Sequence, residues 1–285
     1  MDERWHRRCG WRGVAVVAGL VVGGCAGAVG CSGSGGGAGG GEDARGGEAV
    51  ELLHRSADAL RAAGSSRART SMEMATGGTR VTIRGEGVYD YRRQLGQLRV
   101  LLPQDPAGTS EHRPITELLA PGALFMKNRG AGVPDDKWVR VETATLSDGN
   151  LVTGGATDPF AAAEVLRGAR TATFVGRTEV AGTAVRHYRG TADLAVAADD
   201  ASAGSRGALA AAAKGFATAH VPFDVYLDDD GRIRKVRHRF SFVNGRQRQE
   251  AVAVASTTLL YDFGTPVDVR LPAARDIYAG RIAEE

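Results

Sequence analysis

The residues best suited to covalent chemistry in this sequence of 285 residues are three cysteines, and all of them lie near its beginning. They are Cys9, Cys25 and Cys31. If residues 1–30 are removed as an export signal, as argued below, Cys31 is the one cysteine that remains. We therefore expect no internal disulfide and no cluster of cysteines that could bind zinc or carry out redox chemistry. We therefore expect no cofactor, and the folded part must be stabilised by its hydrophobic core.

The other polar side chains do not form a recognisable catalytic or metal-binding pattern. The six histidines include no H-x-x-x-H or H-E-x-x-H spacing, and no G-x-S-x-G surrounds a serine. The run Asp228-Asp229-Asp230-Gly231 lacks the alternating ligands and the downstream Glu of a calcium loop, and it is typical of a hairpin turn. We therefore expect neither a metal site nor an enzyme.

The first 30 residues have the composition of an export signal. Residues 1–12 carry four Arg, and residues 13–30 are uncharged and rich in small apolar residues. A basic segment before a short apolar one predicts a secretory signal peptide, whereas a membrane-spanning helix needs about 20 strongly apolar residues. Residues 31–47, which are rich in Gly and Ser, then predict a flexible tether ahead of a folded domain over residues 48–282.

Small residues directly before a cysteine resemble the lipobox of bacterial lipoproteins, and two positions fit. Cys25 has the aliphatic Val22 three residues before it, while the tether begins directly after Cys31. The resemblance implies cleavage before the cysteine and attachment of acyl chains such as palmitate to it. We favour Cys31 as the lipid anchor, with Cys25 as the alternative. Two or three acyl chains hold a protein stably on a membrane.

The overall charge excludes a strong nucleic-acid binder. The formal net charge is +3, and loss of residues 1–30, with four Arg and two acidic residues, leaves about +1. Binding to nucleic acid requires a concentrated basic surface, so no nucleic-acid partner is expected.

The order of predicted elements favours an α+β fold built on an antiparallel sheet. Helical spacing or composition predicts helices over residues 48–63, 158–170 and 203–217, with Asp158 as the N-cap of the second. Strands are predicted around residues 81–88, 97–103, 123–127, 137–142, 172–194, 221–242 and 251–264. Short turns at Ala181-Gly182 and Asp230-Gly231 join consecutive strands. About nine to eleven strands and three helices suggest one strongly curved sheet wrapped over helices.

Four stretches, read in order, resemble a family of actinobacterial lipoproteins. They are GALFMKNRG followed by DDKWVRVE, then GRTEVAGTAVRHYRGTADL, PFDVYLDDDGRIRKVRHRFSF and LLYDFGTPVDVRLPA. The family includes the mycobacterial LppX and LprG proteins, and its fold is related to the periplasmic carrier LolA. The resemblance implies a half-barrel with an apolar cleft that binds an acylated lipid or glycolipid at the outer face of the cytoplasmic membrane.

The same resemblance leaves a second function open. Relatives of LolA also use this fold as an interaction module that senses envelope stress, so an envelope transporter or regulator is a possible partner. If the chain carries lipid, the inward apolar positions of the predicted strands would line its cleft. These positions are Leu98, Val100, Leu102, Leu124, Met126, Phe223, Val225, Leu227, Phe240 and Phe242.

Overall fold

The computed structural model describes residues 39–279, except residues 77–78, 104–112, 131 and 244–250. Both cysteines considered as lipid anchors, Cys25 and Cys31, lie outside these residues. Within the described part, no helix combines the length and the apolar composition of a membrane-spanning segment.

Eleven strands form one antiparallel sheet in the order β6-β5-β4-β3-β2-β1-β11-β10-β9-β8-β7. The strands are β1 (Ser65–Thr76), β2 (Thr79–Asp90), β3 (Leu95–Leu101), β4 (Ile115–Ala120), β5 (Ala123–Lys127), β6 (Val139–Glu142), β7 (Ala169–Val180), β8 (Thr183–Asp193), β9 (His220–Leu227), β10 (Ile233–Val243) and β11 (Ala251–Tyr261).

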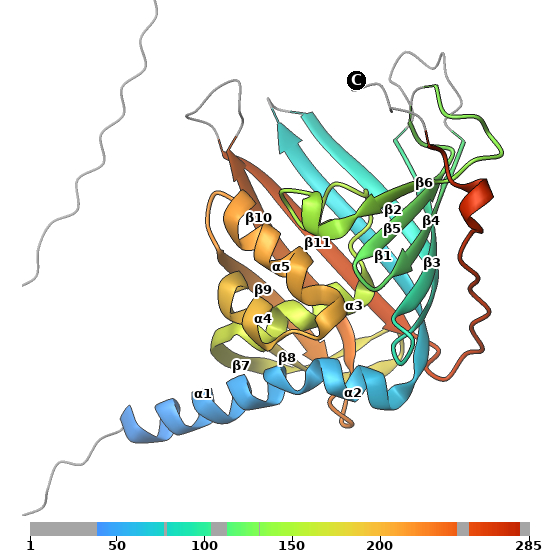
Figure 1. Cartoon of the computed structure of the whole chain (residues 1–285). Helices are drawn as coiled ribbons and strands as arrows, with labels where there is room; N and C mark the ends of the chain where they lie inside the picture. Colours follow the sequence, from blue (N-terminus) through green and yellow to red (C-terminus); the bar gives the residue numbers. More distant parts are fainter. Residues whose placement is uncertain (1–38, 77–78, 104–112, 131, 244–250, 280–285) are drawn as a thin grey trace, which may run out of the picture. The chain divides into compact units, whose positions relative to one another are not determined.

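The sheet is strongly curved and does not close, because β6 and β7 are its two free edges (Figure 1). Each strand pairs with its neighbour in sequence within β1–β6 and within β7–β11. One further pairing, between β1 and β11, joins the two runs. The predicted curved antiparallel sheet is confirmed, and its strand number lies at the upper end of the expected range.

In the described part of the chain, five α-helices accompany the sheet, where the sequence predicted three. They are α1 (Gly39–His54), α2 (Ser56–Ala63), α3 (Pro159–Glu164), α4 (Leu194–Asp200) and α5 (Ala203–Gly215). Helices α3, α4 and α5 lie inside the curve of the sheet, and α1 and α2 run along its lower end (Figure 1). Helix α1 begins at Gly39, inside the segment that the sequence predicts to be a tether.

Local signals in the sequence account for several element boundaries. The Asp158 side chain accepts hydrogen bonds from the N–H groups of Phe160 and Ala161, so it caps α3 as predicted. Strands β9 and β10 form the predicted hairpin around Asp230-Gly231, where Gly231 has a φ of 75° that glycine adopts without strain. The helix predicted over residues 158–170 is shorter, because a 3-10 turn follows Glu164 and β7 starts at Ala169.

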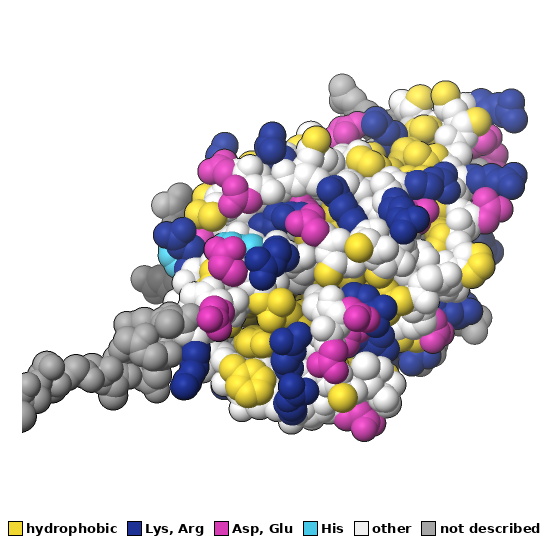
Figure 2. Space-filling view, turned by 90° about the horizontal axis from the view of Figure 1, so that it is seen from below, with side chains coloured by type: hydrophobic (Ala, Val, Ile, Leu, Met, Phe, Trp, Pro, Cys, Tyr) yellow, Lys and Arg dark blue, Asp and Glu magenta, His cyan; other side chains and the backbone are white. Residues whose placement is uncertain are grey.

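The two faces of the sheet have different coverings. The main core lies on the concave face, where strand residues pack against helix residues such as Leu53, Leu60, Phe160 and Leu209. A smaller cluster around Leu118, Phe125 and Val269 lies on the convex face, so part of the C-terminal segment covers that side. Seen from below, Lys, Arg, Asp and Glu are mixed over the surface around a hollow that exposes hydrophobic side chains (Figure 2).

Candidate functional site

The concave face of the sheet forms a trough, and the predicted cleft residues lie along it. Eight of the ten are buried members of the main core: Leu98, Val100, Leu124, Met126, Phe223, Val225, Leu227 and Phe240. Leu102 and Phe242 are half-buried at its margins and pack against the same core. The structure thus brings all ten residues to one surface, and their contact with a ligand stays a prediction.

A segment that we call the inner loop (Asp148–Asp158) lies in this trough beside the helices. Its residues Leu151 and Ala156 are almost completely buried in the main core. A Cβ atom added to Gly155 would lie 3.4 Å from the side chains of Ile83 and Val100, so the loop packs directly on β2 and β3. The loop therefore covers part of the concave face of the sheet.

The loop contacts the sheet through few polar bonds. The Thr157 hydroxyl donates to the carbonyl oxygen of Leu151 at 2.8 Å, and its Oγ1 lies 2.5 Å from Ser256 Oγ on β11. A second side-chain hydrogen bond to the sheet lies at the end of the loop, where the Tyr89 hydroxyl of β2 donates to Asp158 Oδ2 at 3.3 Å. Most of the remaining contact between the loop and the sheet is van der Waals packing.

Asp148 holds the inner loop in its folded conformation. Its buried carboxylate accepts hydrogen bonds from the N–H groups of Asn150, Val152 and Thr153, at 3.1, 2.8 and 2.6 Å. Asn150 is buried, and a buried N–H group without an acceptor is costly, so the carboxylate stabilises this irregular segment. The loop thus has its own internal support, separate from its contacts to the sheet.

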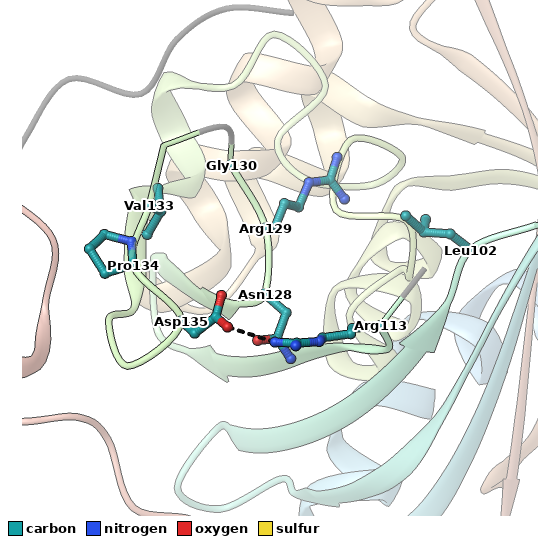
Figure 3. A pocket seen from close by; sticks show the side chains of 8 residues that line it. All are labelled: Leu102, Arg113, Asn128, Arg129, Gly130, Val133, Pro134 and Asp135. Carbon is teal, nitrogen blue, oxygen red and sulfur yellow. Dashed lines mark hydrogen bonds and ion pairs between the residues drawn. The ribbon is translucent and has the colours of Figure 1, made fainter. Parts of the chain in front are cut away.

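Arg129 connects the inner loop to a pocket at the rim of the trough. Arg129 follows β5 and donates from Nη1 to Gly154 O and from Nη2 to Thr153 O, both at 3.2 Å. The same arginine lines a pocket of about 430 Å³ that also includes Leu102, while Arg113 and Asp135 form an ion pair across one side (Figure 3). The rim pocket therefore joins one predicted cleft residue to the loop.

Four buried side chains in and around the trough carry polar atoms without a hydrogen-bond partner among the described residues. These atoms are Thr70 Oγ1, both Glu117 carboxylate oxygens, Asn150 Oδ1 and His238 Nε2. The register places Glu117 beside Leu98 and Met126, and it places His238 opposite Ser256. Such atoms are rare in native proteins, and they mark positions that water or a ligand can satisfy.

Burial shifts the protonation of three of the side chains in this region. Desolvation raises the pKa of Glu117 to about 8, although the charge of Arg129 opposes the change. Burial likewise raises the pKa of Asp158 to about 6, against the hydrogen bonds from Ala161 and Phe160. It lowers the pKa of His238 to about 3, so this imidazole is neutral at pH 7.

The buried His238 does not have the properties of a general base. A general base works best with a pKa near the operating pH, and His238 is far below it. Ser256, the nearest hydroxyl in register, contacts Thr157 instead of an imidazole. In the described part of the chain, no three His, Cys, Asp or Glu side chains gather in a way that could hold a metal ion.

Sequence reasoning did not find the inner loop, Glu117 or Arg129. The signal available for the loop was the glycine-rich stretch SDGNLVTGGATD, which is equally typical of an exposed loop. Glu117 lies in the sequence ITELLA, where a single acidic residue among apolar ones was the only sign of a buried carboxylate.

Comparison with known proteins gives structural likeness only. No family model and no curated protein matches the chain. Similar solved structures include the lipoprotein LppX of Mycobacterium tuberculosis, with 10% identity, 79% of this chain and 99% of that chain covered, and a TM-score of 0.45. LprF of Mycobacterium bovis has 15% identity, covers 80% and 98%, and has a TM-score of 0.40. At these identities no residue role follows from the likeness.

Proposed function

We propose that this chain is a non-enzymatic, lipid-anchored protein of the cell envelope, which binds an acylated lipid or glycolipid in the trough after the inner loop withdraws. Residues 1–30 are the signal peptide, Cys31 is the anchor, and the folded domain extends to residue 282. The observation that supports this proposal is the inner loop itself. It occupies an apolar surface as a separately supported segment with one side-chain hydrogen bond to the neighbouring strand β11.

The energetics are compatible with exchange of the loop for a lipid. Burial of one methylene group contributes about 0.8 kcal/mol, so an acyl chain of ordinary length can offset the lost packing of Leu151 and Ala156. The unpartnered atoms of Thr70 and His238 would then have access to hydroxyl groups of the ligand.

A disulfide between the loop and the sheet tests this proposal. Thr157 Oγ1 and Ser256 Oγ lie 2.5 Å apart, close to the 2.0 Å of a sulfur–sulfur bond, so Thr157→Cys with Ser256→Cys should form a bond. We expect the oxidised double variant to carry no lipid in organic extracts analysed by mass spectrometry. Reduction should restore loading, and each single cysteine variant should bind as the parent does.

The presence of the inner loop in the trough also favours a second candidate, an envelope interaction module without bound lipid. That function predicts no stoichiometric lipid in the parent chain or in either single variant. Equal amounts of lipid in the oxidised and reduced double variant would place the ligand elsewhere and would contradict the trough as its site.

The lipid anchor is tested separately by metabolic labelling with a clickable fatty acid. We expect Cys31→Ala to abolish labelling of the full chain and Cys25→Ala to leave it unchanged. Labelling that persists in Cys31→Ala and disappears in Cys25→Ala would assign the anchor to Cys25. Labelling of a double variant would show that neither cysteine carries the acyl chain.

A further inference from the structure

The edge strand β7 exposes two large hydrophobic side chains next to each other. Phe174 and Val175 are each 51% exposed. Among the described residues, only two other large hydrophobic side chains are classed as exposed, Leu101 at 44% and Leu271 at 43%, and they lie on other parts of the chain. Adjacent exposed hydrophobic residues often mark a contact surface.

A β-bulge explains why neighbouring residues of β7 are both exposed. Phe174 pairs with Tyr188 and Gly176 pairs with His187, so Val175 is an extra residue without a partner in β8. Bulges re-aim side chains at the edges of sheets and interrupt the hydrogen-bonding pattern that another strand would need. The Phe174 ring is held against Tyr188, with ring centroids 5.5 Å apart. The exposed pair is therefore positioned by the sheet and poorly suited to pairing with another strand.

A hollow lies between this part of β7 and helix α1. Its volume is about 510 Å³, and it is lined by Arg45 and Gly46 of α1 and by Ala172, Thr173 and Phe174 of β7. The underside of the molecule, where α1 and β7 lie, shows hydrophobic side chains in a hollow with basic and acidic side chains around it (Figures 1 and 2). Exposed apolar side chains beside a basic residue, here Arg45, suit the boundary between lipid head groups and acyl chains.

The position of α1 in the chain identifies the partner. Gly39 starts α1 eight residues after Cys31, and eight extended residues span at most about 28 Å. Arg45 lies six residues further along the helix, which adds about 9 Å. An acyl anchor at Cys31 therefore allows the hollow to reach the membrane that holds the chain.

We propose that Phe174, Val175 and Arg45 form a docking surface that inserts into the interface of the anchoring membrane and orients the domain on it. This inference rests on the proposed acylation at Cys31 and is independent of lipid binding in the trough. Insertion would present the edge of the sheet, and not its convex face, to the bilayer.

A tryptophan probe tests the contact directly. The chain has three tryptophans, Trp5, Trp11 and Trp138, and cleavage before either cysteine removes the first two. We would place Phe174→Trp in a Trp138→Phe background and reconstitute the acylated full chain into vesicles of phosphatidylcholine and phosphatidylglycerol with brominated acyl chains. We expect the emission to shift to the blue and to lose most of its intensity to bromine quenching.

Matched controls use the other exposed hydrophobic positions. Leu271→Trp and Leu101→Trp are made in the same background. In the vesicles, their emission wavelength and intensity should equal those of the same variants in detergent. If the chain floats with the vesicles but position 174 is quenched no more than position 271, the docking surface is wrong while the anchor stands. If the chain is not acylated and does not float, both proposals fail. A blue-shifted emission at position 174 without bromine quenching, together with a dimer in solution, would show that a second copy of the chain covers this surface.

Discussion

Replacement of Asp148 by Ala is expected to free the inner loop and to increase the rate at which the protein takes up a fluorescent acyl lipid. The substitution removes the acceptor of three N–H groups, those of Asn150, Val152 and Thr153. Loss of three hydrogen bonds to the carboxylate, with the buried N–H group of Asn150 left unpaired, should destabilise the closed loop by about 3 kcal/mol. This free energy corresponds to a roughly hundredfold change in the equilibrium constant between the closed and the open loop.

Hydrogen–deuterium exchange and stopped-flow uptake measure the two parts of this expectation. Exchange should rise in peptides that cover residues 148–158 and stay unchanged in β9 and β10. Asp148→Asn is the matched control, because it keeps one acceptor oxygen and should give an intermediate effect. Faster exchange without faster uptake would show that the lipid does not enter beneath the loop. Unchanged exchange would show that Asp148 does not hold the loop closed.

Replacement of Glu117 by Gln is expected to raise the free energy of unfolding at pH 7 by about 3 kcal/mol. Burial raises the pKa of this carboxyl from 4.5 to about 8. Between these values the folded state keeps the proton and the unfolded state loses it, so stability falls as the pH rises from 4.5 to 8. Each pH unit in that window corresponds to about 1.4 kcal/mol. Gln does not titrate and therefore does not lose stability in this window.

Urea denaturation between pH 4 and pH 9 provides the measurement. The stability of the parent and of Glu117→Gln should diverge above pH 4.5, and their difference should become constant above pH 8. Glu86→Gln is the control, since Glu86 is exposed on β2 and should follow the parent at every pH. Parallel curves for the parent and Glu117→Gln would contradict a protonated Glu117 in the folded protein.

Signals that lie within a few residues made much of the sheet predictable. Ala181-Gly182 and Asp230-Gly231 determine their turns through backbone conformations that these residues adopt, with φ of 77° at Gly182 and 75° at Gly231. Asp158 fixes the start of α3 because its side chain accepts hydrogen bonds from the N–H groups two and three residues later. These turn and capping signals act between residues close in sequence, so they can be recognised without knowledge of the tertiary structure.

Features that depend on distant contacts were not predicted. Strand β1 has Ala68, Thr70 and Met72 on its inner face, so its alternation of apolar and polar residues is weak. Residues 39–47 are rich in glycine and favour a tether by propensity, yet they belong to a helix that packs along β7. The buried position of the inner loop depends on Ser256 and Val100, which lie far from it in sequence.

The order of strands has a consequence for how the chain folds. Runs β1–β6 and β7–β11 consist of pairings between neighbours in sequence, which form quickly because little chain must be closed. The β1–β11 pairing instead joins opposite ends of the described chain, such as Arg67 with Tyr261, so its closure carries the largest entropy loss of any pairing in the sheet. Formation of this seam is therefore the slow, late step, and until it forms each run presents an unpaired strand edge that can aggregate.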